Sequence, residues 1–319
     1  KSFQGASYYT VANPSVSASF TYYLKESIPT LKSKRRQEEG KIRRDKGDIK
    51  YPTLEELKAE QNELEPKLQF TIQDNSGRLV RRFLKSPNAG VHRAEWDFRY
   101  ASTAPIGDGA VKKGEASAGS YVAPGKYTVT MSKIVNGLEF DLTGPIPFNV
   151  IALGNVTLAT KNRKALAEFQ KNVSDLQSSV RAAGELVTNL DEKLNKMVVA
   201  GNFLERDNGE VIKQIHILQD RIDNVKELLY GNRLAYRLDI DFPPSISDRV
   251  NRAVYGSINT TSAPTQTHRQ GYRIAKEEFE PILKEIQQIV KYDIKELENA
   301  LDRAGAPYTP GRIPKRNKH

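Results

Sequence analysis

The side chains with the greatest capacity for chemistry form two groups of carboxylates in the second half of the chain. One group surrounds the Pro-Pro pair at residues 243–244, and the other lies in and beside the run KEEFEP. The six residues are Asp239, Asp241, Asp248, Glu277, Glu278 and Glu280. Two carboxylates about 5–10 Å apart in a cleft can act as the acid and base of a glycosidase. Because runs such as KEEFEP more often form a solvated helix face, we predict no catalytic residue.

The chain contains four histidines and no cysteine. The histidines are His92, His216, His268 and His319. No two of them have the H-x-x-x-H spacing of a helical metal site, and none stands in a recognisable triad order. The absence of cysteine excludes disulfides, zinc–thiolate sites and cysteine nucleophiles. The sequence therefore predicts no metal site and no cofactor.

The tetrapeptide Trp96-Asp97-Phe98-Arg99 is the most distinctive short motif. As a sugar site, it would use Trp96 as a stacking platform and Asp97 and Arg99 as polar clamps. Ala94 and Trp96, however, continue the inward face of a predicted strand. We therefore expect Trp96 to fill a core, with Asp97 and Arg99 bonded to neighbouring backbone.

The net charge of +10 invites a nucleic-acid interpretation. Much of the excess lies in residues 32–50 and in the tail, residues 312–319. Neither stretch interleaves aromatic residues as a base-stacking surface does. We expect a solvated helical insert, a basic tail and no nucleic-acid partner; binding of an anionic polymer through the insert is the alternative.

Two segments are candidates for contact with another protein. Phe3, Tyr8 and Tyr9 precede the first clear strand and have no obvious partner in it. Thr265 and His268 belong to the polar stretch TTSAPTQTH at residues 260–268, just before a predicted helix. A plain connector is the simpler interpretation of that stretch.

Alternating apolar and polar residues in the first half of the chain predict short strands separated by turns. The predicted strands are residues 18–24, 68–73, 79–83, 91–96 and 126–131, and a hairpin around Asn136-Gly137 adds another. They indicate an antiparallel β-sandwich over residues 1–155. Residues 26–66 predict a helical insertion covering one sheet edge, and residues 101–120 predict a loop.

From residue 156 to residue 305, apolar residues recur in alternating steps of three and four, which predicts an antiparallel α-helical bundle. The first predicted seam comprises Leu166, Phe169, Val173, Leu176, Val180, Ala183, Val187, Leu190, Leu194 and Met197. The second comprises Val211, Ile215, Leu218, Ile222, Val225 and Leu229. A late seam, less regular around Asp293, comprises Phe279, Ile282, Ile286, Ile289, Leu297 and Leu301. Residues 306–319 form a basic C-terminal tail.

The apolar runs of the chain are too short to predict a membrane span. The chain begins at Lys1 rather than at a methionine, so we expect a mature or excised fragment.

Seven motifs occur together in a fixed order along nearly the whole chain. They are TYYLK (21–25), TLKSKRRQEE (30–39), YPTLEELKAE (51–60), GVHRAEWDFRY (90–100), APGKYTVT (123–130), SAPTQTHRQGYRIAKEEFEPIL (262–283) and AGAPYTPGRIP (304–314). This combination resembles the C-terminal region of exported bacterial BNR-repeat or sortilin-like, glycosyl-hydrolase-like proteins. The WDFR and APGKYT portion is also similar to the Ig-like fold of bacterial hook-capping and sorted surface proteins.

The resemblance implies an α+β chain: an Ig-like antiparallel β-sandwich with a helical insertion, followed by an antiparallel α-helical bundle. In such proteins a β-propeller with Asp-box repeats precedes this region, and no such repeat occurs here. The resemblance therefore implies a non-catalytic accessory region, exported to the periplasm, cell surface or exterior, that packs against a propeller or a partner subunit. The alternative is a part of a glycoside-hydrolase-like enzyme whose active site lies mainly on the propeller.

Overall fold

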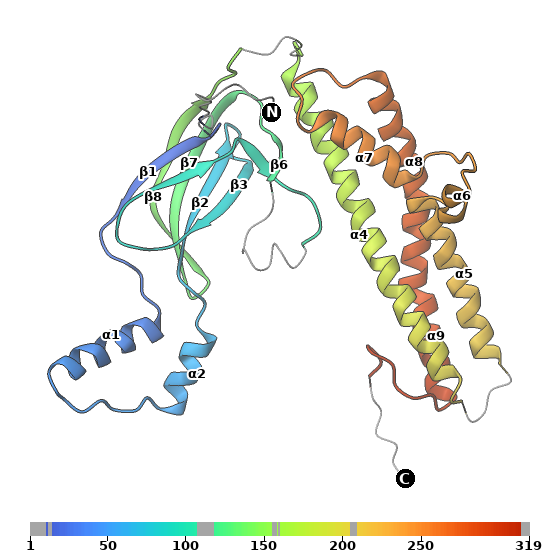
Figure 1. Cartoon of the computed structure of the whole chain (residues 1–319), viewed down its shortest axis with the longest axis horizontal. Helices are drawn as coiled ribbons and strands as arrows, with labels where there is room; N and C mark the ends of the chain where they lie inside the picture. The colour runs from blue at the N-terminus through green and yellow to red at the C-terminus, as the bar shows by residue number, and fades with distance from the viewer. Residues whose placement is uncertain are drawn as a thin grey trace, which may run out of the picture. The chain divides into compact units, whose positions relative to one another are not determined.

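The computed structural model describes residues 11, 15–106, 118–154, 158, 160–204 and 209–313. It divides the chain into two packing units (Figure 1). The strand unit comprises Lys1–Ala101 and Asp108–Asn155, and the helical unit comprises Ser102–Gly107 and Val156–His319. The chain is therefore a mixed α+β protein with antiparallel sheets and several helices.

The strands of the strand unit pair only in antiparallel fashion within the described residues. Their bounds are β1 Ala18–Leu24, β2 Lys67–Asp74, β3 Leu79–Lys85, β4 Gly90–Trp96, β5 Arg99–Ala101, β6 Ala118–Tyr121, β7 Gly125–Val135 and β8 Leu138–Val150. β1 pairs with β4, the larger sheet has the order β3-β2-β7-β8, and β5 pairs with β6. The sequence did not predict β5 and β6, which are only three and four residues long.

Aromatic rings fill the core of the strand unit. Trp96 is 1% exposed and packs against Phe98, Tyr127 and Phe148 at ring-centroid distances of 5.4–6.0 Å. Tyr22 of β1 lies 5.2 Å from Phe70 of β2. The two-stranded β1–β4 sheet and the four-stranded sheet therefore share one core.

Turn residues fix the register of the larger sheet. Asn136 and Gly137 have φ angles of 50° and 78°, and Val135 pairs directly with Leu138. These angles suit the two-residue turn that matches the twist of a hairpin. Gly77, with φ of 76°, closes the β2–β3 turn by donating its N–H to the Asp74 carbonyl. The predicted Asn-Gly hairpin is confirmed.

Strand β2 is buried on both faces, although its sequence alternates. Leu68, Phe70 and Ile72 face the aromatic core, while Gln69 and Thr71 are also buried on the opposite face. β2 lies between β3 and β7, so it is an interior strand of the sheet, and its polar face is shielded from solvent. There the Gln69 amide donates to Glu139 Oε1 at 2.7 Å.

The insertion between β1 and β2 forms two helices, α1 Leu31–Arg44 and α2 Leu54–Asn62. Thr30 and Thr53 cap them through their side-chain oxygens. Arg35 joins the helices: its guanidinium contacts both carboxylate oxygens of Glu60 at 2.6 and 2.9 Å. Neither helix buries a residue, and Figure 1 shows both beyond the strand ends. The insertion therefore differs from the expected edge cover, because it has no apolar stripe to pack on a sheet.

The helical unit is built on long amphipathic helices. Their bounds are α4 Arg163–Gly201, α5 Glu210–Tyr230, α6 Arg233–Arg237, α7 Ile246–Ser257, α8 Gln266–Gln288, the π-helix η1 Ile289–Asp293, and α9 Ile294–Arg303. The sequence did not predict α6. Within the described ranges, no helix is long and apolar enough to cross a membrane.

The predicted seams of α4 and α5 meet in one aliphatic core. All the residues of these two seams are buried except Leu176, which packs on the core while partly exposed. Asp191 pairs with Lys226 at 2.7 Å, and Asn195 bonds Gln219 at 2.8 Å. Since the α4 residue number rises while that of α5 falls, the two helices run antiparallel.

The irregular region around Asp293 is a π-turn joining α8 to α9. The buried positions there are Ile282, Ile286, Ile289, Ile294, Leu297 and Leu301, with a step of five between Ile289 and Ile294. The wider i→i+5 turn accommodates this additional residue. Arg221 of α5 contacts Glu285 and Asp293, each at 2.7 Å, on either side of the turn.

Candidate functional site

The structure disperses the two predicted groups of carboxylates. Asp239 and Asp241 are exposed, and Asp248 bonds Ser245 in the capping box of α7. Glu280 is exposed on α8, where Glu277 pairs with Arg273. Glu278 lies 3.7 Å from Arg249 of α7. In the part of the chain that the structure describes, no cluster of three or more histidine, aspartate or glutamate residues could hold a metal ion.

Two of the histidines lie on separate elements, and the ring of one of them, His92, packs 5.6 Å from the Tyr22 ring of β1. His92 lies on β4 with its Nε2 atom 3.2 Å from the Ala89 carbonyl. His216 is exposed on α5, with its Nδ1 atom 2.9 Å from Gln219 Oε1. His319 lies outside the described residues.

The Trp96 motif has the predicted structural role. The indole N–H donates to the Arg99 carbonyl at 2.9 Å from within the core. The Arg99 side chain donates to the Gly119 carbonyl at 2.8 Å and lies 3.7 Å from the centre of the Tyr121 ring. Asp97 accepts the Arg99 backbone N–H at 3.2 Å. Trp96 is therefore not available as a sugar-stacking platform.

Of the five predicted interaction residues, Phe3, Tyr8 and Tyr9 lie outside the described residues. Thr265 caps α8 by accepting the His268 backbone N–H at 3.2 Å. His268 thus lies in the first turn of a helix rather than in a loop. Its ring packs against Gly256 of α7, where an added Cβ would lie 2.4 Å from Nε2.

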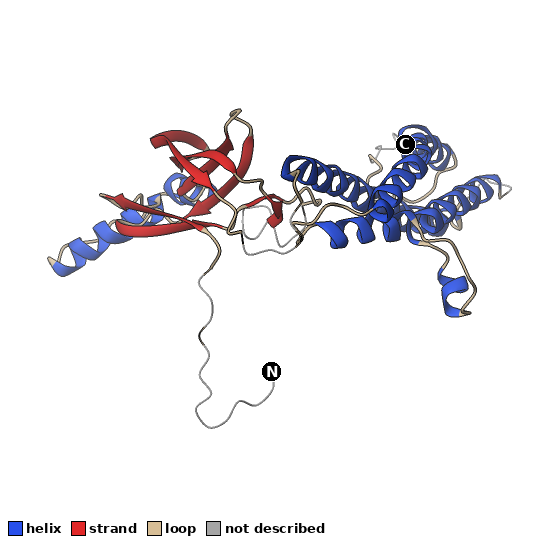
Figure 2. Cartoon of the chain, turned by 90° about the horizontal axis from the view of Figure 1, so that it is seen from above, coloured by secondary structure: helices blue, strands red, loops and turns tan. Residues whose placement is uncertain are grey.

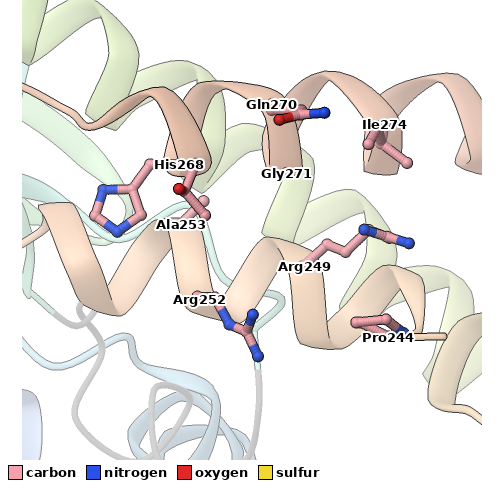
Figure 3. Close-up of a pocket in the computed structure, with 9 residues that line it drawn as sticks. Pro244, Arg249, Arg252, Ala253, His268, Gln270, Gly271 and Ile274 are labelled. Carbon is pink, nitrogen blue, oxygen red and sulfur yellow. The ribbon is translucent and has the colours of Figure 1, made fainter. Parts of the chain in front are cut away.

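His268 also lines a groove between α7 and α8 with a volume of about 250 Å³ (Figure 3). The α7 wall is formed by Arg249, Arg252 and Ala253, with Pro244 just before the helix. The α8 wall is formed by Thr267, His268, Gln270, Gly271 and Ile274. We call this the α7–α8 groove. The wall residues recur at helical steps of three and four, so one face of each helix lines it.

Two arginines dominate the electrostatics of the α7–α8 groove. Arg249 Nε is buried and has no hydrogen-bond partner among the described residues. Its 3.7 Å approach to Glu278 Oε2 is too long for a hydrogen bond. Arg252 is exposed and forms no ion pair with any described residue. The groove can therefore attract a negatively charged group.

A second surface is the apolar segment, residues 230–242, which includes α6. Its large apolar side chains are at least 44% exposed: Tyr230, Leu234, Tyr236, Leu238, Ile240 and Phe242. Figure 2 shows the short α6 on two loop arms, apart from the other helices. Tyr230 is anchored, because its hydroxyl packs where a Cβ of Gly184 would lie, and Ala235 of α6 is buried. Partial burial, and less strongly Glu185, raise the pKa of Tyr230.

Both surfaces were missed by the sequence interpretation. Arg249 and Arg252 lie three residues apart on a predicted helix. This spacing indicates a binding groove only when α8 is known to pack against that helix. The apolar segment had a clearer signal. Tyr236, Leu238, Ile240 and Phe242 alternate with charged residues like a strand, yet no partner strand is present among the described residues.

No protein-family model matches the chain. Comparisons with curated proteins and with solved structures give no significant match either.

Proposed function

We propose that the chain is a non-catalytic accessory and scaffolding region that docks on another folded unit. Following the motif resemblance, that unit is a β-propeller of the same polypeptide or a partner subunit, in an exported bacterial BNR-repeat, sortilin-like protein. The observation that carries the proposal is the apolar segment, whose exposed aromatic and aliphatic side chains are of the kind that anchor interfaces.

Side-chain chemistry in the apolar segment favours a protein surface as its partner. Tyr236 is 87% exposed, and tyrosine buries a large ring while keeping a polar hydroxyl for the interface rim. Arg233 and Arg237 stand beside Asp239 and Asp241, so both signs of charge surround the apolar residues. A mixed charged rim around an apolar centre suits a protein partner better than a uniformly charged polymer.

The detailed architecture of the two units, an Ig-like sandwich and a helical bundle, is part of the same proposal. We interpret the two sheets around Trp96 as an Ig-like sandwich, because they share one aromatic core and pair only in antiparallel fashion within the described strands. We interpret α4, α5 and the α8–α9 helix as an antiparallel bundle with α7 packed on it. The shared aliphatic core of these helices supports this interpretation.

Hydrogen exchange of the isolated chain and of the full-length parent tests the docking proposal. We expect slower exchange over residues 230–242 in the parent, because docking would shield this backbone, and equal exchange in the buried seam of α4. Equal exchange at residues 230–242 in both proteins would reject the proposal. Protection confined to edge strand β8, which also exposes Leu138, Phe140 and Ile146, would reject the apolar segment as the docking surface.

A pair of matched variants separates docking from general surface effects. Tyr236→Ser removes the most exposed ring of the apolar segment, and Tyr51→Ser removes an equally exposed ring from the insertion. We expect Tyr236→Ser to restore fast exchange at residues 230–242 of the parent and Tyr51→Ser to leave it slow.

A further inference from the structure

We propose that the α7–α8 groove binds a tetrahedral oxyanion, the phosphate or sulfate group of a small ligand. This site is separate from the apolar segment and does not depend on the docking proposal. Its evidence is the set of hydrogen-bond donors in the two walls, the size of the groove and the shortage of acidic groups around it.

Arg249 is the first donor. Its side chain is only 22% exposed, and its buried Nε has no hydrogen-bond partner among the described residues. A guanidinium carries five N–H donors, and a buried donor without an acceptor is destabilising. Glu278, the one carboxylate that pairs with it, lies 3.7 Å away and is itself half exposed. An acceptor within the groove would satisfy the donor that Glu278 does not reach.

Arg252 is the second donor and lies one turn further along α7. It forms no ion pair or hydrogen bond with any residue that the structure describes. Figure 3 shows Arg249 and Arg252 on the same helix, with Arg249 on the side of Pro244 and Arg252 next to Ala253, towards the His268 ring. The planar fork of arginine matches the oxygens of phosphate or sulfate in bidentate fashion.

The α8 wall supplies further polar side chains. Thr267 and Gln270 are exposed, and their side chains make no hydrogen bond within the described chain. His268 Nδ1 is buried and likewise lacks a hydrogen-bond partner there. These residues lie in the first two turns of the 23-residue α8, where the helix dipole adds positive potential. The dipole supports the arginines and would not make a site without them.

The shape of the groove favours a compact, tetrahedral ligand group. Ala253 and Gly271 contribute almost no side-chain volume and leave about 250 Å³ between the helices. A tetrahedral oxyanion presents acceptor oxygens in four directions, so it can meet donors from both walls. A carboxylate has two coplanar oxygens and would serve one wall. Since one side of the groove is open to solvent, either a free ion or the end of a larger ester fits.

Titration of the full chain at constant ionic strength tests the proposal. Inorganic phosphate, inorganic sulfate and a soluble phosphomonoester are added in separate arms, with chloride as the reference. Amide NMR signals of residues 249–253 and 267–274 are followed. We expect saturable shifts confined to these residues. Binding of the monoester without the free ions would place the phosphate on a larger ligand. The absence of NMR shifts in all three arms, or shifts scattered over the surface, would overturn the proposal.

Matched variants locate the binding. Arg252→Gln removes an exposed groove arginine, and Arg181→Gln removes an exposed arginine from α4. We expect at least a tenfold loss of affinity for Arg252→Gln, which corresponds to about 1.4 kcal/mol, and no change for Arg181→Gln. Equal affinity of the two variants would overturn the assignment to the groove. Thr267→Val, which keeps every charge, should weaken binding less than Arg252→Gln.

Discussion

The core of the strand unit and the core of the helical unit consist of different kinds of side chain. Rings of Phe70, Phe83, Trp96 and Tyr127 are central to the small core of the strand unit. The core of the helical unit is larger and mostly aliphatic, and it extends along α4, α5 and the α8–α9 helix. Stability is therefore concentrated in a few rings in one unit and distributed over many equivalent positions in the other. Truncation of single residues can test this difference.

Phe70→Ala should give the largest loss of stability. Phe70 is 2% exposed, stacks on Phe83 at 5.3 Å and contacts Tyr22 of the other sheet. Its truncation should cost about 3–5 kcal/mol. Trp96 is the only tryptophan, so denaturation followed by its fluorescence reports the strand unit. A loss below about 1 kcal/mol, well under that range, would show that the stability of the strand unit does not depend on a few aromatic rings.

Leu190→Ala tests the distributed core. Leu190 is buried in the α4 seam, so truncation should cost about 2–5 kcal/mol, while the partly exposed Leu176 should cost less. Far-ultraviolet circular dichroism follows the unfolding of the helices, and Trp96 fluorescence follows the unfolding of the strand unit. We expect the transition seen by Trp96 fluorescence to stay where it is in the wild type. If the Trp96 transition moved equally, the two units would unfold as one.

Alkaline pH should weaken the strand unit through Tyr127. Burial, then the nearby Tyr100 and Asp74, raise the pKa of Tyr127 to about 12, and its hydroxyl donates to the Ala123 carbonyl at 2.6 Å. The folded state holds this proton more tightly than the unfolded chain, whose tyrosine pKa is about 10. The stabilisation is therefore complete below about pH 10 and is lost towards pH 12, by roughly 3 kcal/mol.

Denaturation of the wild type and of Tyr127→Phe across this pH range isolates the effect of Tyr127. The variant should lose less stability between about pH 10 and 12, because phenylalanine has no proton to release. If the free energy of unfolding fell with pH equally in both proteins, the loss of stability at alkaline pH would come from other tyrosines.

Tyr236→Ser should give the smallest effect on stability. Its ring is exposed in the apolar segment and contributes no buried area to the helical core. The free energy of unfolding should change by less than about 0.5 kcal/mol. A loss above about 1 kcal/mol would mean that the apolar segment packs within its own unit, and would remove the reason for a docking partner.

The strands and helices were predictable because their periods are local properties of the sequence. The seam of α5 and the strand β1 lie where the apolar spacing puts them. The pairing of β1 with β4 was not predictable, since about seventy residues separate the two strands and the β2–β3 hairpin intervenes. Burial of Gln69 and Thr71 escaped prediction for a similar reason: it depends on the place of β2 inside the sheet and on side chains distant in sequence, such as Glu139.

The candidate sites were less accessible to sequence reasoning. His268 was singled out in a presumed connector, and the structure places it in α8 against Gly256. The arginines opposite were not recognised, because an arginine on a helix is ordinarily a solvated residue. Only the packing of α7 on α8 converts Arg249 and Arg252 into one wall of a groove.

The π-turn at Ile289–Asp293 sets the angular phase of the helix that follows it. Each residue of an α-helix advances the side-chain direction by about 100°. Deleting one residue here would rotate α9 about its own axis, and would carry Leu297 and Leu301 out of the core although the sequence of α9 is unchanged. The constrained quantity in this turn is thus the number of residues more than their identity, so a change in length should be tolerated far less well than a substitution at the exposed Lys291 or Tyr292.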